Sequence, residues 1–354
     1  MSGVRRLIAC CSAASVLCVL GGCASSGVRG ANPDFSAVRR RAVDCLRAGI
    51  RYPHNAAVRV GAIEALERCP EEEVLPWIRL GLLDEHPAVR FAACCALGTR
   101  RDETSRAALE NHRDDEDGSV QVAALFALHR LGQTNRTGVI PGLLLDHQDP
   151  SVRRNAALVL GRLNEPGAIK VLARAMKDAD EGVRQHALEA MACLGNEEAG
   201  QELTFLANTG IGSEEVFALQ ALAKTKDRHY VDTFRYKLAT ASHLETKLAA
   251  ARALGLMGHD DGFALAMSTL RRTPPPTSDP KDPPDAQRLR IRQLAAGALG
   301  GIGRPAALGL LADVLERDGD PRVQVSVAGA IVEIVEASRP AGVTESSGEP
   351  GGRK

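Results

Sequence analysis

Apolar and polar positions repeat along most of this chain with a period of about 31 residues. Five segments align by eye: AAVRVGAIEAL, PAVRFAACCALG, GSVQVAALFAL, PSVRRNAALVLG and EGVRQHALEAM. Each has an apolar anchor, often Arg next, Ala four positions on, Ala or Val seven on, and Leu or Met eight on. At 100° per residue these offsets share one helix face. The pattern predicts an amphipathic helix with small residues on its buried stripe.

Weaker copies extend the series to nine anchors, spaced 31 or 32 residues apart except for one interval of 45. The anchors are Val58, Val89, Val120, Val152, Val183, Glu214, Thr246, Ile291 and Val323. A second amphipathic stretch lies between successive anchors, for example from Leu308 to Leu315. Each unit is therefore expected to be two antiparallel helices of about 12 residues. The first unit spans about 36–69 and the last ends near Ala337.

Both ends of the anchor-bearing helices carry sequence signals. Three residues before the anchor stand good N-caps, whose side chains accept backbone N–H bonds: Asn55, Asp117, Asp149, Asp180 and Asp320. Pro150 and Pro321 occupy the first helical position, where a missing N–H costs nothing. Twelve residues after the anchor stand residues that tolerate a left-handed C-terminal turn: Gly132, Asn164, Gly195, Gly258 and Gly303.

The repeated D-P-x-V-R-x-x-A-x-x-A-L-G pattern is clearest from Asp149 to Gly161. It is similar to the HEAT-repeat family in its short bacterial, PBS-lyase-like form, and the similarity covers residues 36–337. The resemblance implies an all-α fold, a right-handed α-solenoid of about nine helix pairs. One helix of each pair would lie outside and the other would line the concave side. With helix axes 8–10 Å apart, nine units would make a continuous curved rod, an arc on the order of 80 Å long.

Two segments interrupt or follow the array. Residues 273–286 hold six of the 18 prolines and account for the long interval, as an insertion between the helices of the eighth unit. Residues 338–354 are poor in hydrophobic residues and are expected to be a disordered tail. Aromatic residues make up only 3% of the chain against 44% hydrophobic residues overall. That composition favours close helix packing through small side chains over a β-sandwich.

The first residues read as an export signal. Arg5 and Arg6 precede an uncharged apolar stretch, residues 7–20, which is short for a membrane span and typical of a signal peptide. Leu20-Gly21-Gly22-Cys23 resembles the bacterial lipobox, which implies removal of residues 1–22 and lipid attachment at Cys23. Residues 23–35 would form the lipidated end and a flexible tether. The anchor predicts a cell-envelope protein on the periplasmic side, and Ala24 implies the outer membrane.

No catalytic constellation stands out in the sequence. The cysteines form no C-x-x-C pair, and no nucleophile, P-loop or dinucleotide motif occurs. HEAT-like deoxyhypusine hydroxylases hold iron through His-Glu pairs, and this chain has no His-Glu dipeptide. We therefore expect no enzymatic activity, no cofactor, no metal and no small-molecule substrate. The alternative from the resemblance is an enzyme, or enzyme subunit, of the bilin-lyase type.

Nucleic-acid binding, as in HEAT-like glycosylases, is a third function class. Without residues 1–22 the chain carries a net charge of −2. A nucleic-acid binder normally shows a basic footprint, so the charge balance and the lipobox both oppose this class.

Two sets of residues have competing structural and functional interpretations. An Arg often follows the anchor, at Arg59, Arg90, Arg153, Arg184 and Arg292. These arginines are expected to bridge adjacent units as a ladder, and the alternative is a phosphate-binding row. Internal cysteines are expected to pack as small hydrophobic residues. Cys45 and Cys69 lie on the paired helices of the first unit and are the candidates for a disulfide.

The remaining candidate is a surface for a protein partner. Offsets two and six point away from the packed stripe, where helices are usually polar, yet they hold Val60, Phe91, Val122 and Phe126. The hypothesis is an apolar groove on the concave side, and the alternative is that the adjacent unit covers these residues. A second aromatic cluster, expected mainly to be core, comprises Phe217, Tyr230, Phe234 and Tyr236. The sequence thus predicts a lipid-anchored scaffold that binds one or more proteins.

Overall fold

The computed structural model describes residues 35–70, 72–135, 137–275 and 282–339, and the following account concerns these residues alone. They form eighteen α-helices that pack in pairs. The fold is an all-α solenoid of HEAT-like helix pairs, as the repeat predicts. The expected signal peptide, tether and Cys23 lie outside the described residues, as does residue 340 onward.

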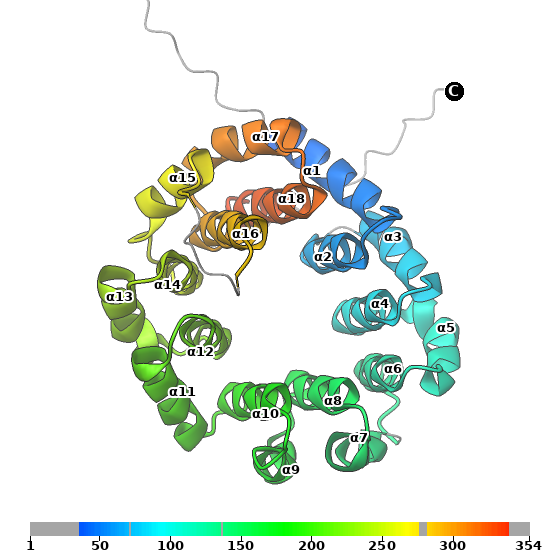
Figure 1. Cartoon of the computed structure of the whole chain (residues 1–354). Helices are drawn as coiled ribbons and strands as arrows, with labels where there is room; N and C mark the ends of the chain where they lie inside the picture. The colour runs from blue at the N-terminus through cyan, green and yellow to red at the C-terminus, as the bar shows by residue number, and fades with distance from the viewer. Residues whose placement is uncertain (1–34, 71, 136, 276–281, 340–354) are drawn as a thin grey trace, which may run out of the picture. The chain divides into compact units, whose positions relative to one another are not determined.

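The helices form two layers, an outer and an inner one (Figure 1). The outer helices are α1 (Phe35–Ile50), α3 (Leu75–Leu80), α5 (Arg106–Asn111), α7 (Ile140–Asp146), α9 (Ile169–Ala175), α11 (Glu197–Thr209), α13 (Val231–Thr240), α15 (Phe263–Arg271) and α17 (Leu308–Arg317). The inner helices carry the anchors: α2 (Ala56–Glu67), α4 (Pro87–Thr99), α6 (Gly118–Arg130), α8 (Pro150–Leu163), α10 (Glu181–Cys193), α12 (Ser213–Lys224), α14 (Leu244–Leu256), α16 (Pro284–Ile302) and α18 (Pro321–Ala337).

Short 3₁₀ turns begin or extend several outer helices. They are η1 (Glu72–Val74), η2 (Gly81–Leu83), η3 (Glu103–Ser105), η4 (His112–Asp114), η5 (Thr137–Val139), η6 (Pro166–Ala168), η7 (Arg228–Tyr230) and η8 (Pro305–Ala307). The insertion predicted over 273–286 lies between α15 and α16, and its last three residues already belong to α16.

The helix signals read from the sequence are confirmed. The side chains of all five predicted N-caps accept backbone N–H groups, as Asn55 accepts from Ala57 and Asp149 from Ser151. At the other end, Asn164 has φ +58° and Gly132 has φ +91°, the left-handed turn that stops the helix. Local chemistry thus sets where these inner helices begin and end.

Small residues let neighbouring inner helices approach closely. A Cβ on Gly98 of α4 would lie 2.6 Å from the Cα of Ala127 on α6, and one on Gly161 of α8 would lie 3.0 Å from the Cα of Ala190 on α10. The core therefore runs from pair to pair along the array rather than sitting within one pair.

The array closes on itself, which differs from the expected open rod. Helices α1 and α2 pack against α18, so the first and last pairs adjoin and the folded unit is a ring (Figure 1). Val325 of α18 lies against Gly49 and Gly61. Arg39 Nε lies 2.7 Å from Glu336 Oε1, and Arg68 lies 2.9 Å from Glu333. Curvature accumulated over nine pairs brings the two ends together, a property that the period alone does not reveal.

Candidate binding surface inside the ring

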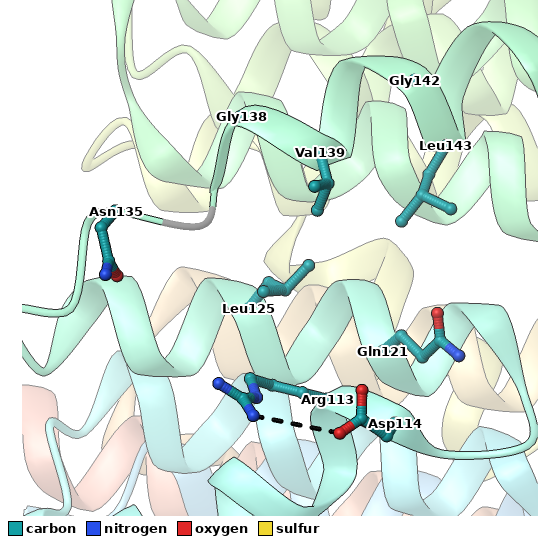
Figure 2. Close-up of a pocket in the computed structure, with 9 residues that line it drawn as sticks. All are labelled: Arg113, Asp114, Gln121, Leu125, Asn135, Gly138, Val139, Gly142 and Leu143. Atoms are coloured by element: carbon teal, nitrogen blue, oxygen red, sulfur yellow. Dashed lines mark ion pairs between the residues drawn. The ribbon is translucent and has the colours of Figure 1, made fainter.

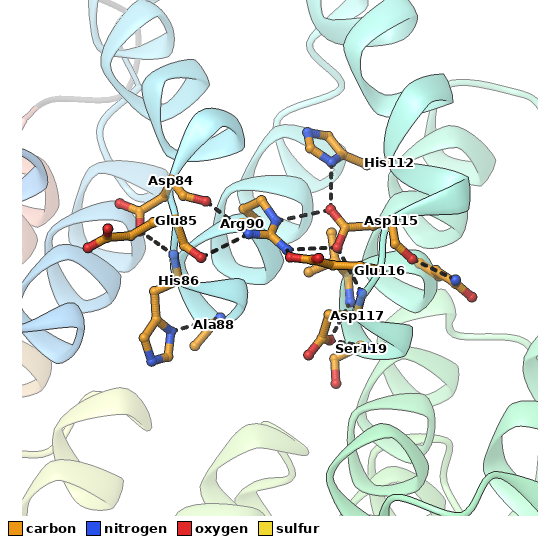
Figure 3. Close-up of polar contacts among 12 residues, drawn as sticks. Asp84, Glu85, His86, Ala88, Arg90, His112, Asp115, Glu116, Asp117 and Ser119 are labelled. Atoms are coloured by element: carbon orange, nitrogen blue, oxygen red, sulfur yellow. Dashed lines mark hydrogen bonds and ion pairs between the residues drawn. The ribbon is translucent and has the colours of Figure 1, made fainter.

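Adjacent pairs in the first half of the ring are joined by Arg–Asp contacts. Arg90, at the start of α4, donates from Nε and a terminal nitrogen to both oxygens of Asp115, at 3.0 and 2.8 Å. Its other terminal nitrogen donates to the carbonyls of Asp84 and Glu85 (Figure 3). Asp115 also accepts the backbone N–H of Asp117, the cap of α6. One guanidinium therefore fixes two successive loops.

The same contact recurs at other joints of this half and at the joint between α16 and α18. Arg59 binds both oxygens of Asp84 at 2.7 and 2.9 Å, and Arg153 binds Asp178 at 2.7 and 2.8 Å. Arg292 forms an ion pair with Asp318, whereas Arg184 donates to the loop carbonyls of Asp178 and Ala179. The predicted structural ladder is confirmed, and Arg59 and Arg90 are buried in these contacts. Guanidinium groups occupied in this way do not form a phosphate-binding row.

The ladder is interrupted between α6 and α8. Gln121 stands where the other units have Arg, and His147 stands where its Asp partner would be. A cavity of about 680 Å³ opens next to this joint (Figure 2). Its walls are Leu125 of α6 and Leu143 of α7, with Arg113 at one edge.

The joint between α12 and α14 uses a different contact. At offset one of α12 stands Glu215, which accepts from Lys237 at 2.5 Å and from Thr246 at 2.7 Å. All three are buried, so an acid on the inner helix replaces the usual cation. Within the described residues, the inner helices α12, α14 and α16 have no side-chain N-cap bond.

The second aromatic cluster does not act as one unit. Phe234 is fully buried, as expected for core, and Tyr236 is 57% exposed. Phe217 is half-buried and lines a cavity of about 860 Å³ between α12, α14 and α16. The four side chains therefore do not form one cluster. Phe217 is the one among them that lines this cavity.

Two of the four predicted partner-surface residues face the inside of the ring. Val60 of α2 and Phe91 of α4 are half-buried and line a cavity of about 390 Å³ bounded by α2, α4, α6 and α8. Val122 and Phe126 are buried, which agrees with the alternative that the adjacent unit covers them and not with an exposed groove at these two residues. The Phe126 ring packs over Gly98 of the preceding inner helix, where the missing side chain leaves room.

Charged residues extend this surface into the centre of the ring. Glu64 lines the cavity beside Val60 and also a second cavity bounded by α2, α12, α14, α16 and α18. Its carboxylate reaches solvent, yet protein surrounds it. That enclosure raises the pKa of Glu64 despite the nearby cations Arg68, Arg162 and Lys224. We define the lumen surface as Val60, Glu64, Glu67, Phe91 and Arg162.

Sequence reasoning missed the charged members of the lumen surface. Glu64 stands at offset six of its unit, the same offset that singled out Phe126. The residue therefore stands at an offset that the sequence analysis considered. A carboxylate at a position expected to be polar does not by itself predict a binding role. What the repeat does not show is that residues of α12, α14, α16 and α18 line a cavity together with Glu64.

The disulfide predicted between Cys45 and Cys69 is not formed in the described structure, where Cys45 is half-buried and Cys69 is buried. Sharing a helix pair does not by itself align two Cβ atoms for an S–S bond. Burial raises the pKa of Cys95 to about 12 and of Cys45 to about 11, which opposes thiolate chemistry.

The described residues carry neither a candidate metal site nor a candidate membrane-spanning helix. They contain no cluster of His, Cys, Asp or Glu arranged to hold a metal ion. None of the helices among them has the length and apolarity needed to cross a membrane.

Comparison with known proteins agrees with this architecture. Residues 43–129 and 142–214 match the family model of HEAT repeats. These two matched segments are similar to HEAT repeats. It is 30% identical over 208 residues to a HEAT repeat-containing taxis protein of Halobacterium salinarum, an alignment covering 56% of this chain and 41% of that protein. The chain thus spans about two fifths of the length of this curated relative.

Solved structures resemble the ring only distantly. The CpcE–CpcF complex of phycocyanin lyase from Nostoc aligns with a TM-score of 0.42 and 17% identity, covering 72% of this chain and 94% of that one. Human deoxyhypusine hydroxylase aligns with a TM-score of 0.37 and 17% identity, covering 85% and 98%.

Proposed function

We propose that this protein is a lipid-anchored, non-enzymatic HEAT-repeat scaffold of the bacterial cell envelope, which binds a partner protein through the lumen surface. Cys23 would carry the lipid and hold the ring on the periplasmic side of a membrane, the outer one in a cell with two membranes. The name of the archaeal relative makes taxis one process in which to look for partners.

The observation that carries the proposal is a set of half-buried apolar side chains on the inner helices, Val60, Phe91 and Leu158, which line one cavity inside the ring. The acidic residues Glu64 and Glu67 line the same cavity beside Phe91 and Val60. Aromatic side chains in such pockets are the residues that most often anchor protein contacts.

The anchor is tested separately from the binding surface. Cells grown with labelled palmitate should incorporate label into the wild-type chain and not into Cys23→Ser, and the variant should move from the membrane to the soluble fraction. Equal labelling of the two would contradict the anchor.

The binding surface is tested by site-specific photo-cross-linking in native membranes. A photoreactive phenylalanine analogue at Phe91 should give a discrete adduct. The same analogue at Phe205, which is 65% exposed on the outer helix α11, is the matched control. Adducts that are identical at both sites, or absent at Phe91, would contradict a scaffold that works through the lumen surface.

A further inference from the structure

From the charges and apolar side chains of the lumen surface we infer the chemistry of the partner: a segment of another protein with a Lys or Arg next to an apolar residue. The cation would meet Glu64 and Glu67, and the apolar side chain would pack on Phe91 and Val60. This inference rests on the proposed function and specifies what the same surface recognises.

The first support is the charge of the cavity wall. Four acidic side chains line the cavity, at Glu64, Glu67, Asp117 and Asp149, against the single cation Arg162 and one histidine. Asp117 and Asp149 cap α6 and α8, so helix N-termini already offset part of their charge. The uncompensated charge is therefore concentrated at Glu64 and Glu67.

The second support is that two of the three cations near Glu64, Arg68 and Lys224, already pair with other carboxylates. Arg68 lies 2.9 Å from Glu333, and Lys224 lies 2.6 Å from Glu189. Among the described residues, the carboxylates of Glu64 and Glu67 have no hydrogen-bond or ion-pair partner within reach. A carboxylate inside the ring that has no such partner gains from a cation that a ligand supplies.

The third support is the position of the apolar side chains. Val60 is one helical turn before Glu64 on α2, and Phe91 lies on the neighbouring inner helix α4. The cavity reaches the starts of α4, α6 and α8 through Pro87, Ser119 and Ser151. An extended segment entering from that side would place an apolar residue on Phe91 and the cation beyond it.

Two synthetic peptides test this charge preference on the purified full chain. Capped octapeptides of alternating Leu and Lys, and of alternating Leu and Glu, have the same length and apolar content. By fluorescence anisotropy the Leu-Lys peptide should bind and the Leu-Glu peptide should not. The E64Q/E67Q variant should weaken Leu-Lys binding about tenfold, and Phe91→Ser should weaken it as well.

The matched control removes the same charge elsewhere. Glu72 and Glu73 are exposed on η1 in the outer layer, so E72Q/E73Q should leave binding unchanged. Circular dichroism checks that every variant folds. Equal binding of both peptides, equal weakening by the two double variants, or no binding of either peptide would overturn the inference.

Mapping the Phe91 adduct separates this inference from the proposed function. A cross-linked partner segment with Lys or Arg beside an apolar residue supports both. An acidic or purely apolar partner segment overturns the charge preference and leaves the scaffold function standing. An adduct with a second copy of this chain, or with its own residues 340–354, overturns the claim of a foreign partner.

Discussion

Two regions of the ring, the half containing α2 to α10 and the joint between α12 and α14, solve the same joining problem with different chemistry, while the joint between α16 and α18 keeps an Arg–Asp pair. In the half containing α2 to α10, most joints use an Arg at offset one that binds an Asp of the next loop, and the Asp also accepts a loop N–H. In the joint between α12 and α14, Glu215 is the inner residue and Lys237 supplies the cation. In the first arrangement the Arg and the Asp also bond to backbone groups of the loops, whereas in the second the buried ion pair is joined by the Thr246 hydroxyl. The comparison teaches that the repeat demands a satisfied polar contact at this offset rather than a particular charge.

The largest effect is expected from breaking the buried pair. Lys237→Met leaves Glu215 as an uncompensated buried charge and should lower the free energy of unfolding by about 3–5 kcal/mol. Adding Glu215→Met should recover most of the loss, since an apolar pair of similar volume is tolerated. Urea unfolding followed by circular dichroism measures both. If the single variant unfolds at the wild-type midpoint, the pair is not what joins α12 to α13.

Close helix approach should matter equally in both halves. A Cβ on Gly255 of α14 would lie 2.5 Å from the backbone nitrogen of Ile302, as close as the contact at Gly98. Gly98→Ala and Gly255→Ala should each destabilise by about 1–3 kcal/mol through overpacking. Thermal melts are the measurement, and Gly138→Ala, where a Cβ meets open space, is the control. A cost confined to one half would show that the halves also differ in backbone packing.

Acid should weaken the Arg153–Asp178 contact of the ladder, and the variant Arg153→Gln isolates the contribution of this contact to stability. Hydrogen bonds from Arg153 lower the pKa of Asp178 in the folded state. Stability from this pair is therefore present above the ordinary carboxyl pKa and is lost as pH falls through the lowered value. Unfolding midpoints between pH 5 and 2 should fall less for Arg153→Gln than for the wild type. Parallel pH profiles of the two proteins would mean that the Arg153–Asp178 contact contributes nothing to stability through the charge of Asp178.

The smallest effect should come from repairing the interrupted joint. Gln121→Arg with His147→Asp would restore the missing Arg–Asp contact between α6 and α8 and should stabilise the ring by about 0.5–1.5 kcal/mol. Each single change should be neutral or slightly unfavourable, so a double-mutant cycle gives the coupling. Additive single effects would indicate that positions 121 and 147 are too far apart for an Arg–Asp contact.

Much of this architecture follows from local signals in the sequence. The period fixed the helix pairs, and Asp149 and Asn164 marked the ends of α8 because caps act through their immediate neighbours. The arginine ladder was also predictable, since Arg59 recurs at a fixed offset. The site was only half predictable: Val60 and Phe91 face the cavity, but Phe126 is covered. Burial of that ring depends on Gly98 of another unit, and the setting of Glu64 depends on closure, neither of which a single repeat encodes.

Because the ring is closed, the fold does not require specialised capping repeats at its two ends. An open array frays from its terminal units, which need special capping repeats. Here α18 covers α1 and α2 just as an interior neighbour would. Cutting the chain in the loop between α10 and α11 and connecting residue 339 to residue 35 with a flexible linker should therefore give a circular permutant with the native helix content. In such a fold the order of the units around the circle matters, and the identity of the first one does not.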